Sequence, residues 1–188
     1  MAEIWDIYDK DRKKTGKTLE RGMPMRQDEY HLVVHVWVRN SRGEWLISKR
    51  TPDKPLGGMW ECTGGSVLSG EDSKTASLRE VKEELGIELD SENGRLFLSF
   101  TRQFRNFPDF SDIWVYHCDC PVESVVLQEG ETCGAKWATS GQIKEMIERG
   151  EFIGRDFVPY IDELFEKYDR KIPVDYNNSL LALIASVQ

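Results

Sequence analysis

The chain has 188 residues, a length that suits one compact domain with extensions at its ends better than two full domains. Its net charge of -8 argues against nucleic acid or an anionic membrane as a partner, because both attract basic surfaces. No apolar run approaches a membrane span, and the first residues do not resemble a secretory signal, so we expect a cytoplasmic protein with reduced cysteines.

The N-terminal part of the chain predicts short antiparallel strands. Two segments at 4–8 and 18–20 flank a polar stretch rich in turn formers, which indicates an N-terminal β-hairpin. The β-branched run HLVVHVWV at 31–38 and the segment at 44–50 are joined by the turn sequence Asn-Ser-Arg-Gly, so we expect two adjacent antiparallel strands. Two prolines and four glycines at 51–65 then predict a loop that leads into a helix.

The predicted helix after this loop has the clearest local signals in the chain. Residues 69–72, Ser-Gly-Glu-Asp, resemble a capping-box start, and Gly86 stands where a helix end is expected. One face carries the apolar residues Leu78, Val81 and Leu85. On another face Glu80, Glu83 and Glu84 fall at i, i+3 and i+4, so their carboxylates are expected to converge. A hard divalent cation, Mg²⁺ or Mn²⁺, relieves the repulsion between such charges.

The rest of the chain predicts further strands and helices. The strands are expected at 95–105, 113–120 and 134–138, with a turn at 106–112. The helices are expected at 140–149, 156–168 and 174–188. Strands that alternate with helices predict an α/β (α+β) fold in which helices enclose a central mixed sheet. The chain divides into a hairpin extension, a main domain and a C-terminal helical extension, at 1–28, 29–170 and 171–188.

The segment GSVLSGEDSKTASLREVKEELGI at 65–87 matches the Nudix box at all nine specified positions, so the chain resembles the Nudix hydrolases. The resemblance implies an α/β/α sandwich, bound Mg²⁺ or Mn²⁺, and hydrolysis of a phosphoanhydride bond in a nucleoside diphosphate linked to a group X. It assigns metal binding to the backbone carbonyl of Gly64 and to the carboxylates of Glu80, Glu83 and Glu84. It also implies that Glu83 and Glu84 act in catalysis.

The resemblance extends to residues that support catalysis or bind substrate. Arg79 is expected to orient the catalytic carboxylates by pairing with Glu71, and a pair with Glu83 inside the helix is also open. Glu129 and Glu131 lie in a stretch that resembles the family's second acid-bearing loop, so either is a candidate outer metal ligand or base, and we assign Glu131 to the catalytic set. Weaker candidates for substrate contact are Arg50, Trp60, Arg102 and Phe104.

Residues 3–120 also resemble the branch of the superfamily that contains isopentenyl diphosphate isomerase. Gly64 and Ser66 stand where that isomerase has its active cysteine and a metal-binding histidine, Cys62 lies two positions away, and His31 matches another metal-binding histidine. Hydrolysis is therefore the favoured reaction, with isomerisation and a non-catalytic nucleotide-binding sensor as alternatives. The expected partner is a small-molecule diphosphate, and we expect a homodimer.

Overall fold

The computed structural model describes residues 2–104 and 107–170, so the helix predicted at 174–188 and the extension that contains it lie outside the described residues. The strands are β1 (Ile4–Tyr8), β2 (Lys14–Glu20), β3 (His31–Arg39), β4 (Trp45–Arg50), β5 (Trp60–Glu61), β6 (Thr63–Ser66), β7 (Gly94–Phe104), β8 (Phe107–His117) and β9 (Thr132–Ala138). The helices are α1 (Ser73–Leu85), α2 (Ser140–Glu148) and α3 (Ile161–Asp169), with short 3-10 turns at Ser91–Asn93 and Val122–Ser124.

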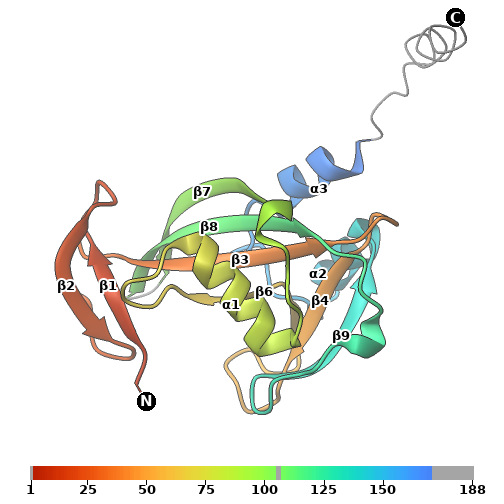
Figure 1. The fold of residues 1–188 in the computed structure, drawn as a ribbon, viewed down its shortest axis with the longest axis horizontal. Helices are drawn as coiled ribbons and strands as arrows, with labels where there is room; N and C mark the ends of the chain where they lie inside the picture. Colours follow the sequence, from red (N-terminus) through yellow and green to blue (C-terminus); the bar gives the residue numbers. More distant parts are fainter. Residues whose placement is uncertain (1, 105–106, 171–188) are drawn as a thin grey trace, which may run out of the picture.

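A central mixed sheet of seven strands forms the middle layer. Its main path runs β5-β4-β3-β8-β7, with β6 paired to β3 and β9 paired to β4. β3 and β8 are parallel, from His31↔Asp109 to Arg39↔His117, whereas the other pairings in this sheet are antiparallel. In Figure 1, α1 crosses one face of the sheet and α2 lies behind the other. The predicted sandwich of helices around a mixed sheet is confirmed.

Alternation along β3 supplies both hydrophobic layers of the core. Val34 and Val36 pack with the buried Val81 and Leu85 of α1. Trp37 points to the opposite face and packs with side chains from α2 and α3. This division follows from the strand itself, since successive residues point to opposite faces. Burial of each such apolar side chain contributes about 1.5–3 kcal/mol, so α1 is held firmly against the sheet.

The ends of α1 are determined by residues next to it in the sequence. The side chain of Asp72 accepts a hydrogen bond from the Thr75 amide at 2.7 Å and caps the start of the helix. Gly86 ends the helix in the left-handed region, with φ of 67°. Both positions agree with the predicted start and stop. Of the predicted apolar face, Val81 and Leu85 are fully buried, and Leu78 packs partly against the same core.

The prediction of a loop at 51–65 is wrong at its C-terminal end, where the chain forms β5 and β6. β6 pairs with β3 through Val33↔Ser66 and His35↔Gly64. This approach is very close, because a Cβ at Gly64 would collide with the Val34 carbonyl. The glycines that suggest a loop therefore permit a strand to lie against its neighbour.

The turn predicted at 106–112 is also wrong, because β8 begins at Phe107. Asp109 and Asp112 are buried in this strand, although aspartate is uncommon in strands. Arg102 donates two hydrogen bonds to Asp109, at 2.9 and 3.0 Å, and Arg12 of the hairpin pairs with Asp112 at 2.5 Å. These distant partners satisfy the carboxylates inside the strand.

The third predicted helix begins later than expected. α3 starts at Ile161, whereas the prediction places its start at residue 156. Pro159 disfavours helical backbone at the residue before it, so the helix does not extend back through Val158. The preceding residues form a turn in which the Phe157 amide donates to the Gly154 carbonyl at 2.9 Å.

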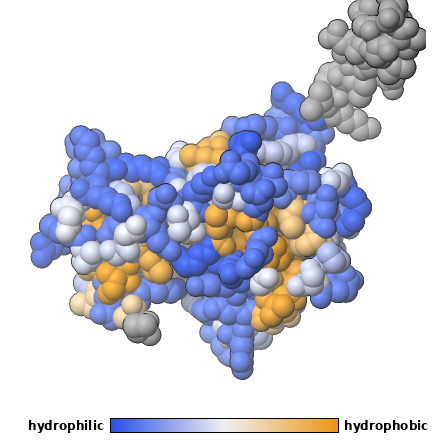
Figure 2. Space-filling view, in the orientation of Figure 1, coloured by the Kyte–Doolittle hydropathy of each residue, from blue (hydrophilic) through white to orange (hydrophobic). Residues whose placement is uncertain are grey.

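The surface is mainly polar. Figure 2 shows hydrophobic residues in separate patches on a largely hydrophilic face. The exposed large apolar side chains come from well-separated parts of the chain: Ile4, Met23, Leu56, Leu96 and Val126. Within 2–104 and 107–170, no helix is long and apolar enough to cross a membrane.

The predicted N-terminal hairpin is present as β1 and β2, and it packs against the loop that precedes α1. Asp6 accepts hydrogen bonds from Lys14 Nζ at 2.6 Å, from Ser69 Oγ at 2.7 Å and from the Gly70 amide at 3.0 Å. Burial alone would raise the pKa of Asp6, but these hydrogen bonds outweigh it and lower the pKa to about 2. The hairpin thus fixes the loop that leads to α1.

We expect Asp6→Asn to remove a pH-dependent part of the stability. The folded-state pKa of Asp6 lies below its ordinary value of 3.8, so the carboxylate stabilises the fold above about pH 4. This contribution is lost as the pH falls toward 2. Urea unfolding of wild type and variant should give midpoints that differ near neutral pH and converge in acid. Asp11→Asn, at an exposed hairpin residue, is the control, and equal neutral-pH midpoints for Asp6→Asn and wild type would contradict the assignment.

Candidate active site

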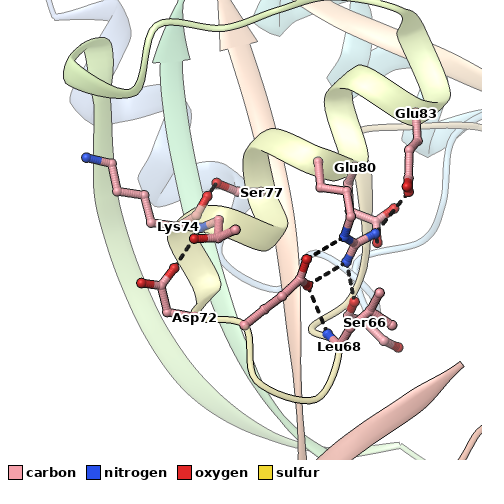
Figure 3. Close-up of polar contacts among 10 residues, drawn as sticks. Ser66, Leu68, Asp72, Lys74, Ser77, Glu80 and Glu83 are labelled. Atoms are coloured by element: carbon pink, nitrogen blue, oxygen red, sulfur yellow. Dashed lines mark hydrogen bonds and ion pairs between the residues drawn. The ribbon is translucent and has the colours of Figure 1, made fainter.

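Arg79, in the second half of α1, is the centre of the polar cluster. Its guanidinium donates to both carboxylate oxygens of Glu71, at 2.9 and 3.0 Å, and to the Ser66 carbonyl at 3.0 Å. Another nitrogen of the guanidinium, Nη1, donates to both Glu80 and Glu83, each at 2.9 Å. Figure 3 shows the carboxylates of Glu80 and Glu83 turned toward this guanidinium. The expected pair with Glu71 and the alternative pair with Glu83 are both present.

Glu84 lies on the inner side of the same helix. Its Oε2 is buried and has no hydrogen-bond partner among the described residues. Burial is the largest cause that raises the pKa of Glu84 well above its ordinary value, followed by the charges of Glu80, Glu61 and Glu131. Burial likewise raises the pKa of Glu80 to about 7, against the opposing effect of Arg79. The negative charges of Glu80, Glu61 and Glu131 therefore disfavour ionisation of Glu84 at this end of α1.

The predicted convergence of Glu80, Glu83 and Glu84 on one point does not occur. In the described part of the chain, no group of three or more His, Cys, Asp or Glu side chains is arranged to hold a metal ion. Glu80 and Glu83 pair with Arg79, whereas Glu84 Oε2 has no hydrogen-bond partner among the described residues. The residues nevertheless fit a hard divalent cation, because such a cation binds carboxylate oxygens and would supply the missing partner of Glu84 Oε2.

Glycine at position 65 leaves room for the carboxylate of Glu80. A Cβ built on Gly65 would collide with that carboxylate, so any larger residue would displace it. We expect Gly65→Ala to lower turnover by about 10- to 100-fold, because a displacement of about 1 Å in a catalytic group has effects of this size. Steady-state kinetics and thermal unfolding together test the expectation. Gly141→Ala on α2, where an added Cβ meets only ordinary contact, is the matched control, and equal turnover of the two variants would contradict the role of Glu80.

A cavity of about 460 Å³ opens beside this cluster. Gly64 and Gly65 of β6 form part of its wall, together with Glu61 of β5. Glu61 pairs with Arg50 at 2.7 Å, yet burial raises the pKa of Glu61 above its ordinary value. The sequence prediction omits Glu61, and no local pattern could have identified it, because strand pairing alone brings it to the site.

The candidate substrate residues separate into two groups. Arg50 and Arg102 line the cavity, and their contact with substrate stays a prediction. Trp60 is not among the lining residues, and its ring packs against the core under Lys136 Nζ at 4.3 Å. Phe104 is the last residue of β7 and pairs in register with Phe107 at the start of β8.

Glu131 lies in a loop that docks on the C-terminal end of α1. The Glu84 carbonyl accepts hydrogen bonds from the Gln128 amide and from Thr132 Oγ1, both at 3.1 Å. The Glu131 carboxylate pairs with Lys54, while Glu129 is exposed. The structure therefore brings Glu131 to the same end of the helix as Glu84.

Two histidines of β3 line the cavity and have different side-chain partners. His31 stacks on Trp5 with ring centroids 4.4 Å apart. His35 Nδ1 lies 2.7 Å from the hydroxyl of Tyr160. Burial, and to a lesser extent the charge of Arg102, lowers the pKa of His35 to about 3, so its ring is neutral at pH 7.

Comparison with known proteins identifies the family. The NUDIX domain matches residues 29–161. The "Uncharacterized Nudix hydrolase" of Listeria monocytogenes is 37% identical over 154 residues, which cover 80% of this chain and 88% of that protein. A solved protein from Deinococcus radiodurans has a TM-score of 0.70 at 24% identity and covers 86% of this chain and 98% of its own.

A third protein resembles this fold at lower identity. The bifunctional NMN adenylyltransferase/ADP ribose pyrophosphatase from Francisella tularensis, complexed with AMP and a Mn ion, has a TM-score of 0.58 at 18% identity and covers 78% of this chain and 43% of its own. The domain match, the relative from Listeria and the box at 65–87 agree with one another. The chain therefore belongs to the Nudix hydrolase family, whose members act on pyrophosphate bonds.

Proposed function

We propose that this chain is a Mg²⁺- or Mn²⁺-dependent hydrolase that cleaves the phosphoanhydride bond of a nucleoside diphosphate linked to a group X. The observation that carries the proposal is the buried, unpaired Oε2 of Glu84, which lies among the charges of Glu80, Glu61 and Glu131. A buried carboxylate in such surroundings is unfavourable unless a cation compensates its charge. The AMP and Mn ion bound by the Francisella tularensis protein support this choice of ligands.

The metal would be held by residues of the box and the strand before it. The proposed ligands are the backbone carbonyl of Gly64 and the carboxylates of Glu80, Glu83 and Glu84. When bound, a divalent cation offsets the negative charge of the diphosphate and so favours attack at phosphorus. Arg79 has the supporting role, because its hydrogen bonds hold Glu80 and Glu83 in defined orientations.

Side chains around the cavity would carry out proton transfer and hold the substrate phosphates. One carboxylate, from Glu83, Glu84 or Glu131, accepts a proton from the attacking water, and a nucleotide-type phosphate leaves as the P–O bond breaks. Arg50 and Arg102 are placed on the cavity wall, where a guanidinium can contact a substrate phosphate. These roles follow from position and chemistry together.

Isomerisation of a prenyl diphosphate is less well supported by this site. Gly64 and Ser66 carry no thiol or imidazole at the positions where the isomerase has its active cysteine and a metal-binding histidine. Cys62 is buried, and this burial raises the pKa of its thiol well above the ordinary value, so the thiol stays protonated. The acidic side chains proposed for phosphoanhydride hydrolysis support the hydrolase over the isomerase.

A phosphate-release screen tests the proposed function. Purified protein with Mg²⁺ or Mn²⁺ is offered nucleotides, nucleotide sugars, dinucleoside polyphosphates, coenzymes and prenyl diphosphates, and Glu84→Gln serves as the blank. Metal-dependent release from one class is expected and identifies X. Interconversion of two alkenes with the diphosphate retained would establish the isomerase, and binding without turnover would establish the sensor.

A further inference from the structure

The hydroxyl of Tyr160 joins three side chains beneath the cavity. Trp37 Nε1 lies 3.0 Å from this hydroxyl and His35 Nδ1 lies 2.7 Å from it. The Cys62 thiol also contacts the hydroxyl. Tyr160 and Trp37 are buried, so water does not supply alternative partners.

The donors and acceptors in this group determine the tautomer of His35. An indole nitrogen only donates, so Trp37 uses a lone pair of the Tyr160 oxygen. Tyr160 then has one proton to donate, and the imidazole nitrogen of His35 is a much stronger acceptor than the thiol sulfur of Cys62. His35 Nδ1 therefore accepts, and its single ring proton resides on Nε2.

Nε2 of His35 is directed to the cavity. His35 lines the cavity, and no hydrogen bond between described residues uses its Nε2. Nε2 retains some accessible surface, because it is not one of the fully buried polar atoms without a hydrogen-bond partner. The cavity wall combines apolar side chains, such as Val33 and Ile153, with charged ones, such as Glu61 and Arg102.

We propose that the Nε2–H of His35 is a specificity determinant, which donates a hydrogen bond to an uncharged oxygen or nitrogen acceptor in the X group. The inference rests on the proposed function, since it concerns the substrate of the same site. A neutral donor that a bound ligand shields from water discriminates against any ligand that leaves it unpaired. An X group made only of hydrocarbon would leave Nε2–H without a partner, whereas a base or sugar would satisfy it.

The tautomer can be measured without any substrate. The chain contains three histidines, so wild-type protein labelled with ¹⁵N-histidine gives few ring signals, and loss of one set in His35→Gln assigns His35. Long-range ¹H–¹⁵N spectra at pH 7 are expected to show a protonated Nε2 and an unprotonated Nδ1. A proton on Nδ1, alone or together with Nε2, would overturn the proposal.

Substrate preference is the second test, with ADP-ribose, dGTP and dimethylallyl diphosphate as probes. His35→Phe should raise KM by at least about 10-fold for ADP-ribose or dGTP, with a much smaller change in kcat, whereas His35→Gln, which retains a donor, should stay within about 3-fold. His117→Gln, at an exposed histidine, is the control. An equal loss for dimethylallyl diphosphate, or no loss for either nucleotide, would overturn the proposal. Absence of turnover in wild type would count against the proposed function instead, and the tautomer spectrum would still decide the role of His35.

Discussion

Glu84→Gln is expected to lower turnover by about 10²- to 10⁴-fold and to leave the apo protein at least as stable as wild type. The two effects have one cause. Glu84 carries an unpaired, buried carboxylate oxygen surrounded by like charges, which is unfavourable for folding and suited to a cation. Glutamine keeps the volume and removes the charge, so the fold loses a source of repulsion while the site loses a ligand.

Thermal unfolding and kinetics separate these effects. Wild-type protein should gain thermal stability on addition of Mn²⁺, because a ligand that binds the folded state stabilises it, and Glu84→Gln should show a much smaller gain. Glu88→Gln is the matched control, since Glu88 is an exposed residue just past the end of α1 and pairs only with Lys82 among the described residues. Wild-type turnover in Glu84→Gln, or an unchanged Mn²⁺ effect, would remove Glu84 from the metal site.

Elements defined by local sequence were predictable, and those that depend on distant partners were not. α1 has its capping residues, Asp72 and Gly86, directly at its ends, so its limits can be read from the sequence. β8 begins with FPDFSD, which has the composition of a turn. Its buried Asp112 is satisfied by Arg12, which lies 100 residues earlier, and no local pattern contains that information.

The predictions for the candidate site show the same contrast between local sequence and distant partners. Helix spacing correctly places Glu80, Glu83 and Glu84 on neighbouring positions, but spacing does not determine rotamers. Arg79 pairs with two of these carboxylates, those of Glu80 and Glu83, and not with Glu84. Glu61 joins the group only because β5 pairs with β4, a fact that requires the fold. The sequence therefore predicts which acidic residues lie close together better than it predicts the arrangement of their side chains.

Arg79→Met is expected to destabilise the apo protein by about 2–4 kcal/mol and to reduce turnover strongly. The side chain of Arg79 is 21% exposed, and its removal leaves Glu71 and Glu80, which are similarly enclosed, without their cationic partner. Arg79→Lys should fall between the two proteins, because one ammonium cannot reproduce the fork that bridges three carboxylates and the Ser66 carbonyl. Urea unfolding in EDTA measures the loss.

The response of this variant to metal distinguishes a structural arginine from one that shares its carboxylates with a cation. If Mn²⁺ and Arg79 stabilise the same acids, Mn²⁺ should restore part of the stability of Arg79→Met while turnover stays low, since orientation is not restored. Arg149→Met, which breaks an exposed pair with Glu145 at 3.0 Å, should change stability by no more than about 0.5 kcal/mol and should not respond to Mn²⁺ beyond wild type. A deficit in Arg79→Met that Mn²⁺ leaves unchanged would mean that the metal does not bind these carboxylates, even if catalysis were lost.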